Sequence, residues 1–71
     1  MEAIDLTAAG DWDGAHQLVM PERSPAACWL HAILHRMEGD LANADYWYGL
    51  AGRRRPSVST DEELEHLRRG A

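Results

Sequence analysis

The sequence holds a single cysteine, no phenylalanine and no lysine. Because Cys28 has no second thiol to pair with, an internal disulfide is excluded and a reducing, cytoplasmic setting is the expectation. We find neither a signal-peptide pattern nor an apolar run long enough to cross a membrane, so no membrane contact is expected. Strand-like alternation and low-complexity tracts are also missing, which favours an all-α fold in one domain.

Length and charge narrow the function classes further. A chain of 71 residues buries only about 60% of the surface that it exposes when unfolded, so its core is marginal and contact with a partner or a second copy is expected. All basic residues are arginines, and the formal net charge of −5 makes nucleic acid an unlikely partner.

The strongest pattern is a helix hairpin over residues 24–52. Ser24 and Pro25 form a helix start, and Gly39 followed by Asp40 forms a turn into a second helix that ends at Gly52. The first helix has an apolar arc at spacings of three and four, made of Ala26, Trp29, Leu30, Ile33, Leu34 and Met37. The opposite side of that helix holds His31, His35 and Glu38. We therefore expect the histidines to lie away from the core.

The second helix predicts a core-facing side and an exposed side. The core-facing set is Leu41, Ala44, Trp47, Tyr48 and Ala51. Tyr46 points well away from this set, because adjacent residues on a helix differ by 100° in direction. Two apolar faces joined by a short turn should pack antiparallel.

Shorter helices are predicted on both sides of this hairpin. Residues 2–9 form a first helix ended by Gly10, and an apolar stripe then runs from Trp12 to Val19. Because Gly10 and Asp11 match Gly39 and Asp40 at an offset of 29 residues, residues 10–22 are interpreted as a partial repeat of the unit at 24–56. A last helix at 59–69 begins with capping-box spacing between Thr60 and Glu63, and Leu64 and Leu67 dock it. In total we expect four or five short helices.

The second unit resembles the tetratricopeptide or Sel1-like helical repeat. The likeness is carried by positions where that family has small, aromatic and proline residues, namely Gly39, Ala44, Tyr48, Ala51 and Pro56. It implies antiparallel helix hairpins with a C-terminal docking helix. The resemblance also implies that Cys28, His31, Ala32 and His35 face the core, which conflicts with the apolar arc that helical periodicity predicts. The strings GDWDGAH and MEGDLANADYWYGLAGR also resemble small bacterial proteins of unknown function with EGDxxNAxYWY-type motifs.

Catalytic and metal chemistry have little support in the sequence. His31 and His35 stand at i and i+4, a spacing that lets two imidazoles hold a metal on one helix face. The glutamate of the HExxH motif is missing, and no third or fourth ligand is evident beyond Glu38 or Asp40. A metal-binding protein using His31 and His35 is therefore the alternative, and no metal or cofactor is assigned. Cys28 has no evident base, and the carboxylates are explained by helix caps, so we do not expect an enzyme.

The aromatic residues point to protein contact. Tyr46, Trp47 and Tyr48 are adjacent and cannot all face one core, and tyrosine and tryptophan are enriched at binding hot spots. The predicted partner-binding residues are Tyr46, Trp47, Arg53, Arg54 and Arg55. The expected function is a non-catalytic interaction module or self-associating protein, with an unknown protein partner or a homodimer. A plainer interpretation makes Trp47 part of the core. A third hypothesis is that an anionic ligand or RNA binds to the arginines near the C-terminus, namely Arg53, Arg54, Arg55, Arg68 and Arg69.

Overall fold

The computed structural model describes residues 1–70 and places them in five α-helices. These are α1 (Glu2–Ala8), α2 (Trp12–Val19), α3 (Pro25–Met37), α4 (Leu41–Leu50) and α5 (Thr60–Arg68). No strand occurs among the described residues, and the helices form one compact globule. The prediction of an all-α fold with four or five short helices is confirmed.

Two Gly-Asp turns of the same geometry connect the helices of each hairpin. Gly10 and Gly39 adopt positive φ angles of 89° and 82°, a conformation that only glycine adopts without steric cost. The aspartates that follow have nearly identical dihedral angles, and their side chains accept hydrogen bonds from the backbone N–H groups of Gly14 and Asn43. The sequence offset of 29 residues therefore corresponds to a repeated local structure.

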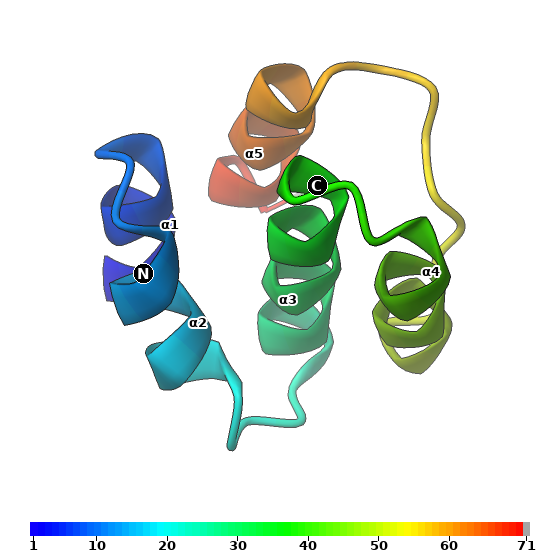
Figure 1. Ribbon diagram of the computed structural model, residues 1–71, viewed down its shortest axis with the longest axis horizontal. Helices are drawn as coiled ribbons and strands as arrows, with labels where there is room; N and C mark the ends of the chain where they lie inside the picture. Colours follow the sequence, from blue (N-terminus) through cyan, green and yellow to red (C-terminus); the bar gives the residue numbers. More distant parts are fainter. Residues whose placement is uncertain (71) are drawn as a thin grey trace.

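Helix α3 lies in the middle of the molecule, with α2 on one side and α4 on the other (Figure 1), and α5 packs along a further side of it. Every residue from Ala27 to His35 is buried. Periodicity predicts His31 and His35 away from the core, which is wrong, whereas the repeat resemblance predicts them inward and agrees with their burial. The physical reason is that α3 has helical neighbours on several sides. Met37, predicted in the apolar arc, is 44% exposed.

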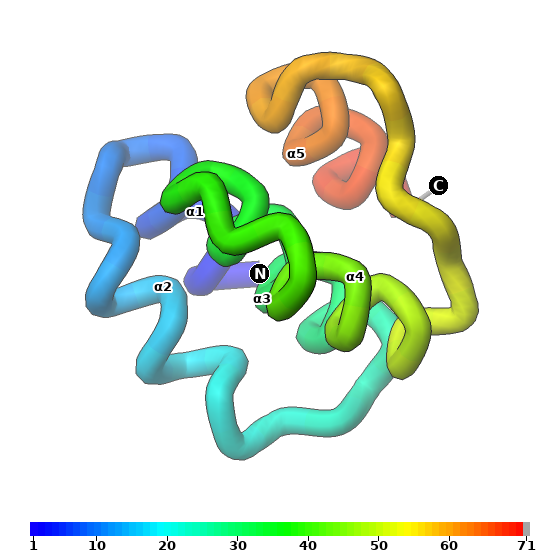
Figure 2. Tube along the Cα trace, turned by 45° about the vertical axis from the view of Figure 1, so that its right-hand side comes forward, coloured from blue at the N-terminus to red at the C-terminus, as the bar shows by residue number. Residues whose placement is uncertain are grey.

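Helix α4 packs mainly on α3 and touches α5 through the Tyr48 hydroxyl, whereas α5 reaches its place through a long connection. The backbone of α4 lies close to α3 and to no other helix in the described chain. Its predicted core residues Ala44 and Tyr48 are buried, but Leu41 is 45% exposed. The segment 51–59 then runs around the molecule to α5 (Figure 2). As predicted, α5 buries Leu64 and Leu67.

The start of α5 differs from the predicted capping box. Ser59 is the N-cap and accepts a hydrogen bond from the backbone N–H of Glu62. Glu63 is 1% exposed and turns into the core, where its carboxylate accepts hydrogen bonds from Trp29 Nε1 at 2.9 Å, Arg36 Nη1 at 2.7 Å and the Tyr48 hydroxyl at 2.6 Å. Because these donors belong to α3 and α4, one carboxylate joins three helices.

Candidate functional site

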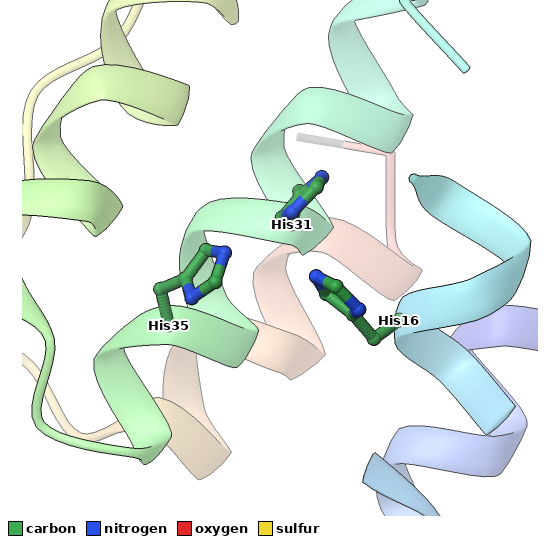
Figure 3. Close-up of side chains that lie close together, drawn as sticks. All are labelled: His16, His31 and His35. Carbon is green, nitrogen blue, oxygen red and sulfur yellow. The ribbon is translucent and has the colours of Figure 1, made fainter. Parts of the chain in front are cut away.

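Three of the four histidines gather between α2 and α3. His16 comes from α2, and His31 and His35 come from successive turns of α3; one ligand nitrogen from each ring lies within 4.8 Å of the other two. Figure 3 shows the three rings around a common space. The pair on α3 is visible in the sequence as an i, i+4 spacing. His16 was missed, because only the packing of α2 against α3 brings it to them.

We call His16, His31 and His35 the histidine cluster. Two tryptophans contact it, one on each side. Trp12 stacks on His16 with ring centroids 4.7 Å apart, and its Nε1–H donates a 2.7 Å hydrogen bond to the carbonyl of Leu34. Trp47 stacks on His31 at 3.7 Å with an angle of 11° between the planes. The rings are therefore fixed by aromatic contacts as well as by the backbone.

The environment of His31 favours its neutral imidazole. Burial, together with the nearby His16, His35 and Arg23, lowers the pKa of His31 from 6.5 to about 4. Its Nδ1 is buried and has no hydrogen-bond partner among the described residues. Nδ1 of His35 instead lies 2.6 Å from Oε1 of Glu38, which leaves Nε2 of His35 for another contact.

A second candidate site is the solvent-facing side of α4, which we call the outer α4 face. It consists of Ala42, Tyr46, Gly49 and Leu50, all of them exposed. Tyr46 is 60% exposed and Leu50 is 47% exposed, and their spacing of four places them side by side. These four residues are uncharged. The single charged residue within α4 is Asp45, which is exposed at the border of the face beside Ala42 and Gly49 and pairs with Arg55.

The predicted partner-binding residues separate into two groups. Tyr46 points outward, as predicted, whereas Trp47 is half-buried against His31. The arginines follow the C-terminus of α4: the guanidinium of Arg53 lies 3.6 Å over the ring of Trp29, and Arg55 pairs with Asp45 at 3.3 Å.

Arg54 is exposed, and a shallow pocket of about 330 Å³ brings these arginines together with Asp45, Tyr48 and Gly49. The arginine triplet is thus continuous with one edge of the outer α4 face.

Cys28 lies inside α3 and is 1% exposed. A thiol at that depth has no access to a substrate in solution, so we propose no catalytic role for Cys28.

Comparison with known proteins identifies no relative. No family model, characterised protein or solved structure matches this chain. Within residues 1–70, none of the helices has the length and apolar character needed to span a bilayer.

Proposed function

We propose that this protein is a non-catalytic helical module that associates with a second copy of itself through the outer α4 face. The observation that carries the proposal is an exposed helix side that combines Tyr46 and Leu50 with two small residues and no charge. An outward face of a surface helix is normally polar, so an uncharged one indicates a contact surface.

Gly49 strengthens this interpretation. Glycine within a helix costs about 0.5–1 kcal/mol relative to alanine, yet a Cβ added at position 49 would meet nothing within 4 Å. Gly14 in α2 is different, because a Cβ there would lie 2.5 Å from Oδ2 of Asp11. Crowding within one copy therefore does not explain why position 49 is a glycine. A close approach by the backbone of a second copy explains it.

Charge complementarity favours an antiparallel pair of α4 helices. The N-terminal end of α4 carries Glu38 and Asp40, and its C-terminal end is followed by Arg54 and Arg55. If the Tyr46 ring of one copy lies over Gly49 of the other, the acidic end of each helix meets the basic end of its partner. The same patch then serves both copies, as a two-fold symmetric interface requires.

The helix-hairpin architecture is consistent with such a role. The tetratricopeptide-like unit proposed for residues 24–56 belongs to a class of repeats that bury helix faces against neighbouring units, and a lone unit leaves one face uncovered. Here α4 has α3 on one side and solvent on the other.

Light scattering coupled to size exclusion tests the proposal on untagged protein over a hundredfold concentration range. We expect a concentration-dependent dimer that is weakened at least tenfold by Tyr46→Ala with helicity unchanged. Met20→Ala serves as the control, because Met20 is also exposed, at 51%, but lies beyond the end of α2.

A charge test separates specific pairing from general stickiness. Arg54→Glu should weaken the dimer with helicity unchanged. A wild-type protein that is monomeric at every concentration would overturn the proposal, as would a dimer that Tyr46→Ala leaves intact.

A further inference from the structure

The histidine cluster has the chemical features of a metal site that the i, i+4 pair alone does not provide. Two helices contribute three imidazoles, which is the ligand number of catalytic and open zinc sites. The fourth histidine, His66, is exposed on α5, so it offers an internal comparison within the same chain.

An unsatisfied nitrogen marks the cluster as incomplete. His31 is 2% exposed, and its Nδ1 has no hydrogen-bond partner among the described residues. A buried polar atom without a partner is destabilising. Aromatic stacking against Trp47 explains where the ring lies, but it does not satisfy this nitrogen.

Glu38 supplies the supporting contact that metal-binding histidines usually have. Its Oε1 lies 2.6 Å from Nδ1 of His35, and a carboxylate in this position fixes the tautomer with the proton on Nδ1 and the lone pair on Nε2. The same contact makes Nε2 more basic and thus a better metal ligand.

We propose that His16, His31 and His35 bind one divalent transition-metal ion, of which Zn²⁺ is the best fit, with water or an exchangeable anion as the remaining ligand. Three nitrogen donors without a carboxylate select zinc, copper or nickel over magnesium and calcium.

The geometry requires a small closure. Ligand nitrogens around a tetrahedral zinc ion are about 3.3 Å apart, given Zn–N bonds of about 2.0–2.1 Å, whereas the nitrogens here span up to 4.8 Å. This closure requires a small inward shift of His16, the partly exposed member of the three, together with the Trp12 ring that stacks on it. Binding would therefore tie α2 to α3.

Isothermal titration of untagged, chelator-stripped protein with Zn²⁺ tests the site. We expect one ion per chain, at least a hundredfold weaker binding in His16→Gln, and no change in His66→Gln. Glu38→Gln should weaken binding by about 10- to 100-fold, because the supporting contact is lost. Since His16 is partly exposed, His16→Gln should keep its fold, which far-UV circular dichroism verifies.

Substitution with Co²⁺ gives a readout of coordination geometry. Absorption bands typical of tetrahedral cobalt should appear in the wild type and be lost in His16→Gln. Absence of binding at up to 100 µM Zn²⁺ would overturn the proposal, and so would equal binding by wild type and His16→Gln. Either result would leave the cluster as an aromatic packing feature only.

Discussion

The Tyr48 hydroxyl lies 2.6 and 2.7 Å from the two carboxylate oxygens of Glu63, and both residues are 1% exposed. Burial and the nearby carboxylate raise the pKa of Tyr48 well above its usual value, so the phenol remains a donor at every pH where the protein folds. Arg36 balances the carboxylate with an ion pair at 2.7 Å and also donates to the carbonyl of Val58. This contact set fastens α5 and its preceding loop to the α3–α4 hairpin.

Removing the Glu63 carboxylate should lower the free energy of unfolding more than removing the Tyr48 hydroxyl. Glu63→Ala leaves the buried Tyr48 and Trp29 donors without an acceptor and removes the ion-pair partner of Arg36, which keeps only its hydrogen bond to the Val58 carbonyl. We therefore expect a loss of about 3–5 kcal/mol in the free energy of unfolding. Tyr48→Phe removes one donor and should cost about 1.5–3 kcal/mol. Urea unfolding followed by circular dichroism measures both, with the exposed Glu22→Ala as control. Equal losses in the two variants would contradict this account of the network.

Stability should fall as pH drops from about 6.5 to 4. The folded pKa of His31 is about 4 and the ordinary value is 6.5, so in this window the unfolded chain binds a proton at position 31 that the folded chain does not. The free energy of unfolding then decreases towards low pH, by at most about 1.4 kcal/mol per pH unit for one proton.

The measurement is urea unfolding at several pH values in the presence of a chelator. Above pH 6.5, His31 is neutral in both the folded and the unfolded chain. It then no longer makes the free energy of unfolding depend on pH. His31→Gln should flatten the profile between pH 5 and 6.5, where few carboxylates titrate. An unchanged slope in that variant would show that other groups cause the pH dependence.

Gly49→Ala should stabilise a single copy while weakening association. The added Cβ meets nothing within 4 Å, so the variant gains about 0.5–1 kcal/mol from helix propensity. Gly14→Ala is the matched control and should destabilise, because its Cβ would displace the Asp11 carboxylate that caps α2. Thermal unfolding, measured at concentrations too low for the dimer to form, shows whether each variant is more or less stable than the wild type.

Cys28 should resist thiol reagents in the folded protein. Its side chain is buried within α3, so labelling by a chromogenic disulfide reagent requires local or global opening. We expect slow labelling that accelerates in step with the unfolded fraction as urea is added. Rapid labelling in native buffer would place Cys28 near the surface and contradict the packing of α3.

Local signals determined much of this fold from the sequence alone. Glycine's freedom at positive φ and the capping oxygens of Ser24 and Asp40 act within a few residues, so the helix boundaries and hairpin turns follow directly from residue type. The outward direction of Tyr46 also follows from helical geometry.

Tertiary structure alone decided which polar residues enter the core. Periodicity assumes one buried face per helix, whereas α3 is packed from several sides, so His31 and His35 are buried where the pattern predicted solvent. Glu63 matched a local capping pattern, but three donors from α3 and α4 draw it inward. His16 joins the other two histidines because α2 packs on α3, a contact between residues far apart in the chain. Spacing in a sequence reports neighbours on one helix, and the candidate site is made between helices.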